Sequence, residues 1–238
     1  MMPEARLGVL GGMGPQATSV FYQLVIDRTD ARSDQEHVNA LILSDSGMPD
    51  RTAAILSGDT EPVYRRLLSG AKLLEQGGCT VIAVPCHTAH FFLDWVQEQI
   101  QIPILHMVRE AAQAVAAQGH TRPGILATDG TIRSELYQKE FAALGIQAAV
   151  PSPAAQKQVM SLIYDDVKAG RDGDPQTFFA VHEDLLAQGC DCGVLACTEL
   201  SVFASRHQLP PFYTDAMAVL AERAVLACHK PLRTTFIK

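Results

Sequence analysis

The chain has 238 residues, of which 47% are hydrophobic and 19% are charged, and its formal net charge is −7 at pH 7. The length allows one large domain or two small ones, and the acidic balance argues against nucleic-acid binding, which needs a basic face. No apolar stretch reaches the length of about 20 residues that spans a membrane. The N-terminal segment lacks the basic and apolar regions of a signal peptide, so we expect a cytoplasmic protein whose six cysteines are reduced.

Short β-rich runs alternate with helical patterns along the chain. The expected strands lie at 6–10, 38–43, 80–85, 104–106, 123–127, 146–150, 193–196 and 211–213. Between them apolar residues recur at helical spacing, for example at Val63, Leu67 and Leu74. Strands that alternate with helices of this length predict βαβ units and parallel sheets.

The chain contains two similar halves. The segment LLEQGGCTVIAVPC, which ends at Cys86, resembles LLAQGCDCGVLAC, which ends at Cys197, with one residue deleted. Near the start of each half, GVLGGMG parallels GILATDG. The period of about 110 residues is too long for a solenoid, whose repeats run about 20–50 residues, and it indicates two domains.

We therefore expect an α/β fold with two pseudo-symmetric domains, each a parallel sheet flanked by helices, with the active site in the cleft between them. Residues 1–103 together with about 211–238 form the first domain, which contains Cys86, and about 104–210 form the second, which contains Cys197. The segment from 211 to about 228 crosses back to the first half, because it parallels the segment at Ile104 that opens the second.

The two matched cysteines are the candidate catalytic residues. Each ends an apolar run and is followed by a threonine, Thr88 or Thr198, and by residues that can open a helix. The carboxyl ends of parallel strands are where open α/β sheets place their ligands, and a helix N-terminus favours a thiolate. Two thiols that face each other across a cleft can take a proton from one face of a carbon and return one to the other.

The sequence disfavours both a dinucleotide site and a zinc site. The turn that begins at Gly12 matches G-x-G-x-x-A, but Asp45, the acid that ends the second strand, lies too far along for a dinucleotide site. Because Pro15 suits a first helical position, the turn predicts an anion pocket and no nicotinamide cofactor. Three thiols at Cys190, Cys192 and Cys197 lack the further motif of a zinc site, so we expect no metal.

Five ordered motifs span essentially the whole chain: GGMGPQAT, PDRTAAIL, PCHTAH, IYDDVKAG and CTEL. Together they resemble the aspartate/glutamate racemase superfamily, and specifically its aspartate racemase branch. The resemblance implies two pseudo-symmetric α/β domains, usually a homodimer, and no cofactor. It also implies that one cysteine thiolate removes the α-proton while the other cysteine, as a thiol, delivers a proton from the opposite face. By motif these residues are Cys86 and Cys197.

The resemblance also implies the substrate-binding residues. Arg51 grips a substrate carboxylate and Lys168 is the second cation, four residues after Tyr164 and on the same side of a helix. Glu199 stands where the glutamate racemase branch carries histidine, and it is a candidate partner for the substrate ammonium. The residues expected at the α-carboxylate are Thr88, Thr198, Met13 and Gly14.

One residue departs from the family pattern, because His87 stands where PCNTAH carries asparagine. A charged His87 would stabilise a thiolate at Cys86, whereas a neutral one would reshape the pocket. This departure bears on the identity of the substrate more than on the proton-transfer chemistry. We expect His90 to be structural.

The sequence predicts a cofactor-independent racemase that interconverts L- and D-aspartate, or glutamate. The alternative is a related enzyme on another substrate, such as a hydantoin racemase or a maleate isomerase. Arg51 and Lys168 favour a dicarboxylate, and two matched thiols argue against a decarboxylase or a non-catalytic binding protein. One methylene changes pocket fit by only about 1–3 kcal/mol, so the sequence does not separate aspartate from glutamate.

Overall fold

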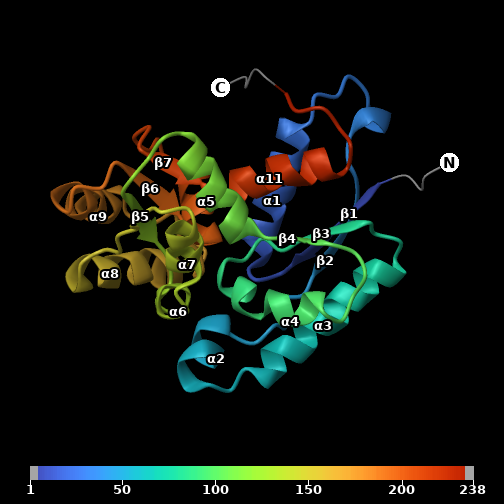
Figure 1. Cartoon of the computed structure of the whole chain (residues 1–238), viewed down its shortest axis with the longest axis horizontal. Coiled ribbons are helices and arrows are strands. Elements are labelled where there is room, and N and C mark those ends of the chain that lie inside the picture. The colour runs from blue at the N-terminus through green and yellow to red at the C-terminus, as the bar shows by residue number, and fades with distance from the viewer. Residues whose placement is uncertain (1–4, 234–238) are drawn as a thin grey trace.

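The computed structural model describes residues 5–233. It contains two parallel sheets flanked by helices, with strand orders β2-β1-β3-β4 and β5-β6-β7 (Figure 1). The strands are β1 (Arg6–Gly11), β2 (Asn39–Ser44), β3 (Val81–Ala83), β4 (Ile104–Leu105), β5 (Pro123–Leu126), β6 (Cys192–Leu195) and β7 (Tyr213–Asp215). The expected α/β architecture with a parallel sheet in each half is confirmed.

Helices connect the strands and cover the sheets. The α-helices are α1 (Pro15–Arg28), α2 (Arg51–Ser57), α3 (Glu61–Gln76), α4 (Leu93–Gln97), α5 (Met107–Ala117), α6 (Asp129–Arg133), α7 (Leu136–Ala143), α8 (Pro153–Met160), α9 (Pro175–Ala187), α10 (Thr198–Arg206) and α11 (Ala216–Ala227). Two 3₁₀ turns, η1 (Asp34–Glu36) and η2 (Thr88–Phe92), and a π-helical segment, η3 (Ser161–Val167), complete the order. On α3 the helical pattern of Val63, Leu67 and Leu74 faces the core, and Pro15 begins α1 as expected.

Two strands pair in the opposite sheet from the one that the sequence predicts. Strand β4 pairs with β3, so residue 104 lies in the first sheet, and β7 pairs with β6, so residue 213 lies in the second. The segments QIPIL and QLPPF that carry these strands are alike and short. Their pairing depends on which sheet edge each one reaches, and that is decided by the packing of the whole chain. The expected strand at 146–150 forms only an isolated bridge between Gly124 and Ala149.

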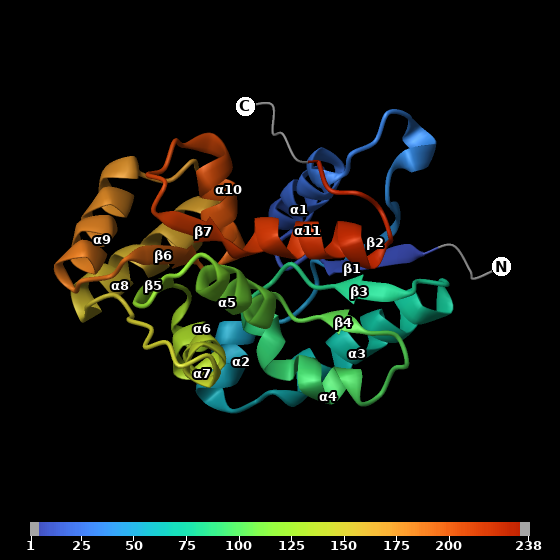
Figure 2. The same cartoon turned by 45° about the horizontal axis from the view of Figure 1, so that its top comes forward.

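The chain returns to the first half through helix α11, after β7 has completed the second sheet. Figure 2 shows α11 running between the two sheets, beside α1 and α5. Leu220 of α11, Phe21 of α1 and Val108 of α5 are fully buried in one core that also contains residues of both sheets, such as Val9 and Val194. This shared core holds the two halves together and fixes how the ends of their strands face each other.

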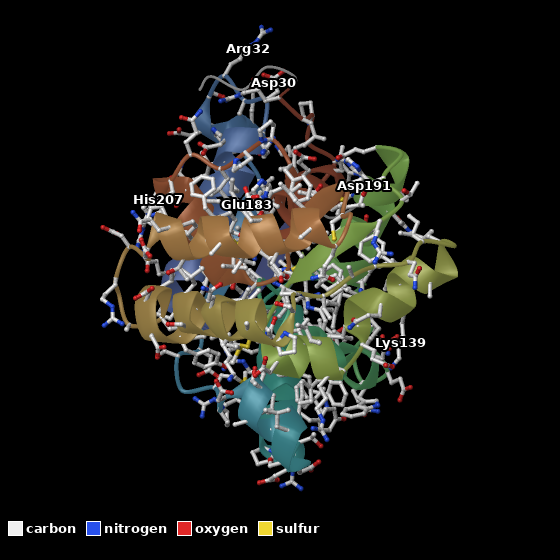
Figure 3. The ribbon with its side chains drawn as sticks, turned by 90° about the vertical axis from the view of Figure 1, so that its left-hand side faces the viewer. Asp30, Arg32, Lys139, Glu183, Asp191 and His207 are labelled. Atoms are coloured by element: carbon white, nitrogen blue, oxygen red, sulfur yellow. The ribbon has the colours of Figure 1, made fainter. Side chains whose placement is uncertain are left out.

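The surface carries charges of both signs. Figure 3 labels exposed side chains of each sign, among them Asp30, Arg32, Lys139 and Glu183. In the described part of the chain no helix is long and apolar enough to cross a bilayer. All six cysteines are buried and unpaired.

Candidate active site

A narrow cavity of about 10 Å³ lies where β3 and β6 end. Cys86 follows β3 and Cys197 follows β6, and both thiols line this cavity while being about 5% and 6% exposed. The lining residues are Met13, Asp50, Arg51, Thr52, Cys86, His87, Thr88, Thr128, Tyr164, Lys168, Cys197, Thr198 and Glu199. The structure thus brings both candidate catalytic residues and nearly all of the expected substrate-binding residues to one place.

Gly14 is the expected residue that does not line the cavity. It is the N-cap residue of α1, and its carbonyl accepts the hydroxyl of Thr18 at 3.0 Å. The same hydroxyl accepts the backbone N–H of Gly12 at 2.8 Å, so this turn bonds largely to itself and only Met13 reaches the cavity. Asp45 forms an ion pair with Arg66, which is consistent with its exclusion as a dinucleotide ligand.

The loop that carries Cys86 is held in place by His90. The backbone N–H of Met107 donates to His90 Nε2 at 3.0 Å, so Nδ1 carries the proton and donates it to the carbonyl of Cys86 at 2.9 Å. Burial, together with the charge of the neighbouring His106, lowers the pKa of His90 to about 3. His90 is therefore a neutral, structural histidine, as the sequence predicts.

Arg51 is the first residue of α2 and lies beside Cys86. Its two terminal nitrogens donate to backbone carbonyls, Nη1 to Pro49 at 2.9 Å and Nη2 to Met13 at 3.2 Å. Burial opposes its charge, but the nearby Cys86 and Asp50 outweigh burial and raise the pKa of Arg51. In the described part of the chain the buried Nε has no partner, so the anchored guanidinium keeps one donor for a ligand.

His87 forms part of the cavity wall directly after Cys86. The side chain is about 2% exposed, and neither ring nitrogen has a hydrogen-bond partner among the described residues. Burial, and to a smaller extent His90, lower the pKa of His87 well below its ordinary value. The imidazole is therefore neutral, and of the two roles that the sequence left open the structure favours reshaping the pocket.

Cys197 lies in a different environment from Cys86. It is the N-cap residue of α10, and its Sγ donates to Glu199 Oε2 at 2.9 Å. The other oxygen, Oε1, accepts from Lys168 Nζ at 2.6 Å. Burial and the charge of Glu199 raise the pKa of Cys197 well above its ordinary value, although Lys168 partly opposes this rise. These contacts hold Cys197 as a thiol and already engage the carboxylate expected to bind the substrate ammonium.

Lys168 and Tyr164 lie together at the end of η3, as their spacing predicts. Lys168 Nζ is 5.3 Å from the centre of the Tyr164 ring, and the Tyr164 hydroxyl donates to Asp50 Oδ2 at 3.1 Å. Burial opposes the charge of Lys168, but Glu199 and Cys197 outweigh it and raise the pKa, so the amine stays charged. Because Lys168 forms an ion pair with Glu199, Arg51 is the cation whose hydrogen-bond donor is more available to a ligand.

A cluster of threonine hydroxyls crosses the cavity wall, and reasoning from the sequence missed most of it. The Thr88 Oγ1 is 3.1 Å from that of Thr128 and 2.9 Å from that of Thr131, and Thr52 donates to Thr128 at 3.2 Å. Thr52 and Thr88 come from the first half, whereas Thr128 and Thr131 come from the second. The position of Thr128 in GILATDG, matching the glycine turn GVLGGMG, is the signal that could have found it.

One further group could in principle hold a metal ion, but it lies elsewhere. His120, Asp191 and Cys192 offer ligand atoms within 4.8 Å of one another at the amino end of β6, opposite to Cys197. The Asp191 carboxylate already accepts the backbone N–H groups of Thr121 and Arg122. Burial, and then the charge of Asp191, raise the pKa of Cys192 to about 12, which disfavours the thiolate that a metal needs. The residues fit a structural role better than a metal site.

Comparison with known proteins agrees with this geometry. The model of the Asp/Glu/hydantoin racemase family matches residues 10–224. The broad specificity amino-acid racemase RacX of Bacillus subtilis is 29% identical over 223 residues, which are 92% of this chain and 96% of that protein. The aspartate racemase of Picrophilus torridus superposes with a TM-score of 0.81 at 27% identity and 96% coverage of both chains. The glutamate racemase of Campylobacter jejuni, at 18% identity, a TM-score of 0.63 and coverage of 98% and 89%, shares the fold.

Proposed function

The chain belongs to the Asp/Glu/hydantoin racemase family, and we propose that it is a cofactor-independent amino-acid racemase that interconverts the enantiomers of aspartate or glutamate. The observation that carries this proposal is the pair of buried thiols, Cys86 and Cys197, in the wall of one cavity. The names of the Bacillus and Picrophilus relatives support racemase chemistry, and the second of them supports aspartate.

In the proposed reaction Cys86 acts as the thiolate in one direction. Its sulfur takes the α-proton from one face of the substrate, and the Cys197 thiol gives its own proton to the opposite face of the carbanion. The step leaves Cys86 as a thiol and Cys197 as a thiolate, so the reverse direction uses the same residues with exchanged roles. The cation of Arg51 favours the first thiolate, and the hydrogen bond to Glu199 holds the proton on the second thiol.

The α-proton of an amino acid is weakly acidic, so the carbanion needs electrostatic support in a site that excludes water. Arg51 supplies a fixed cation whose Nε donor is available to a substrate carboxylate. Lys168 supplies a second cation at the other wall, with Glu199 as its counter-charge. Thr88 and Thr198, with Met13, are proposed at the α-carboxylate.

The cavity of about 10 Å³ is too small for an amino acid, so we propose that the two halves open to admit the substrate and close around it. A homodimer and a cytoplasmic location belong to the same proposal. The family resemblance supports the dimer, and the unpaired cysteines fit a reducing compartment.

The proposal is tested by incubating the purified protein with each enantiomer of aspartate, of glutamate and of a set of neutral amino acids, followed by chiral chromatography. We expect each enantiomer of aspartate or glutamate to approach a one-to-one mixture, with the same rate in the presence of EDTA or of hydroxylamine, which traps pyridoxal. Conversion of neutral amino acids alone would reassign the substrate class. Conversion of no amino acid would overturn the proposal in favour of a hydantoin racemase or a maleate isomerase.

A further inference from the structure

Behind the Cys86 wall of the cavity, two buried rings face each other without a hydrogen bond. The ring of His87, in the first half, lies 5.9 Å from that of Tyr137, on α7 in the second half, with an angle of 34° between their planes. Tyr137 is fully buried, and its hydroxyl has no partner among the described residues. The same holds for both nitrogens of His87. Three polar atoms are thus buried together with their bonding capacity unused.

Buried polar atoms without partners are unfavourable, so each of them calls for a partner, which a bound ligand can supply. His87 lines the cavity, whereas Tyr137 packs in the core behind it against Phe141. The imidazole therefore has the cavity on one side and the tyrosine on the other. Burial, with the charges of Asp215 and Cys197, raises the pKa of Tyr137 well above its ordinary value, so its hydroxyl keeps its proton.

A neutral imidazole donates from one nitrogen and accepts at the other. The hydrogen bond made by one ring nitrogen therefore decides whether the other ring nitrogen donates or accepts. The chain shows this kind of pair at a second place, where the Tyr213 hydroxyl lies 3.0 Å from Nδ1 of His182. That pair lies outside the cavity and is already formed. The pair at the cavity has the same chemistry and is not yet formed.

We propose that Tyr137 is a positioning residue: with substrate bound, its hydroxyl donates to one ring nitrogen of His87, so that the other nitrogen donates to a substrate carboxylate. The inference rests on the proposed racemase function, because it takes the substrate carboxylate as the ligand of His87. The bond from Tyr137 orients an uncharged donor beside Cys86. Together with the bond to the substrate, it gives each of the three atoms a hydrogen-bond partner. It also explains how histidine performs there the donor role of the asparagine amide of PCNTAH.

The test compares Tyr137→Phe with Tyr213→Phe. We expect Tyr137→Phe to raise KM about fivefold, the effect of one lost hydrogen bond, while kcat stays within about twofold. Its melting temperature should stay the same or rise, because the free protein loses only a hydroxyl without a partner. Tyr213→Phe, which loses a bond that already exists, should lower the melting temperature and leave KM unchanged.

The double variant separates positioning from packing. In the His87→Asn background, Tyr137→Phe should have no further effect on KM, because the ring that it positions is gone. In the ¹⁵N NMR spectrum with aspartate present, the wild type should show one His87 tautomer and Tyr137→Phe a mixture. A wild-type KM in Tyr137→Phe, or an equal effect with and without His87, would overturn the inference while leaving the racemase function intact. A wild type that racemises no amino acid would overturn both.

Discussion

The two matched cysteines, one in each half of the chain, have opposite electrostatic surroundings. Cys86 lies beside the anchored cation of Arg51 and a neutral His87. Cys197 instead donates to the carboxylate of Glu199, which is held by Lys168. The duplication determines where each sulfur lies, and the residues packed around it give each sulfur a different electrostatic environment.

This difference matters because a racemase with two bases needs one ionised and one protonated group at the start of each turnover. Two thiols in identical surroundings would share the proton equally. Here the cation of Arg51 lies beside Cys86, whereas burial and the carboxylate of Glu199 raise the pKa of Cys197. Environments that push two titratable groups apart are how enzymes assign acid and base roles at one pH.

The largest expected effect comes from removing either sulfur. Cys86→Ala and Cys197→Ala should each lower racemisation about 10³-fold or more, because each variant lacks one of the two proton carriers. In deuterated water each single variant should still exchange the α-hydrogen of one enantiomer, and the two variants should differ in which one. The measurement is α-deuterium incorporation by NMR together with chiral chromatography.

A matched control is Cys79→Ala, because Cys79 is a buried thiol outside the cavity. Its racemisation rate should be that of the wild type. If both cavity variants racemised both enantiomers at wild-type rates, the two-base assignment would be wrong.

An intermediate effect is expected from a substitution that makes the environment of Cys197 more like that of Cys86. Glu199→Gln removes a charge that raises the pKa of Cys197, and it frees Lys168 to lower that pKa further. Alkylation of Cys197, followed by peptide mass spectrometry as a function of pH, should therefore begin at lower pH than in the wild type. Racemisation should fall about 10- to 100-fold, because the proton is no longer held on the donor.

Glu183→Gln is the control for this change, since Glu183 is an exposed carboxylate on α9. It should alter neither the alkylation profile nor the rate. An unchanged profile in Glu199→Gln would show that the carboxylate does not set the acidity of Cys197.

The smallest expected effect comes from the threonine cluster that joins the two sides. Thr128→Val deletes the hydroxyl that contacts Thr52, Thr88 and Thr131, at a cost of about 1 kcal/mol in unfolding free energy. The melting temperature should fall by about 2–4 °C, measured by calorimetry. Racemisation should slow by a few-fold, because the cluster contains Thr88 of the cavity wall.

Thr60→Val is the control, because the side chain of Thr60 caps no helix through a hydrogen bond. It should leave the melting temperature unchanged. An unchanged melting temperature in Thr128→Val would contradict the view that the cluster joins the two halves.

Much of this molecule could be predicted from local patterns. Apolar runs that end at Cys86 and Cys197 predict buried strands with thiols at their carboxyl ends, and the structure has both. The motifs that resemble the racemase superfamily predict most of the cavity wall, including Arg51 and Lys168. The misassigned strands, β4 and β7, are short and alike, so their sequences do not specify which sheet they join.

The sequence by itself determined the parallel α/β class, the duplication and the places of the two thiols, because these depend on periodicity and strand ends that a few neighbouring residues decide. Only the tertiary structure decided the partners of each thiol. Lys168 meets Glu199 across 31 positions of sequence, and Tyr137 meets His87 from the other half of the chain. Such contacts depend on how helices pack over the shared core, and together with burial they decide the charge of groups such as Cys197 and Lys168.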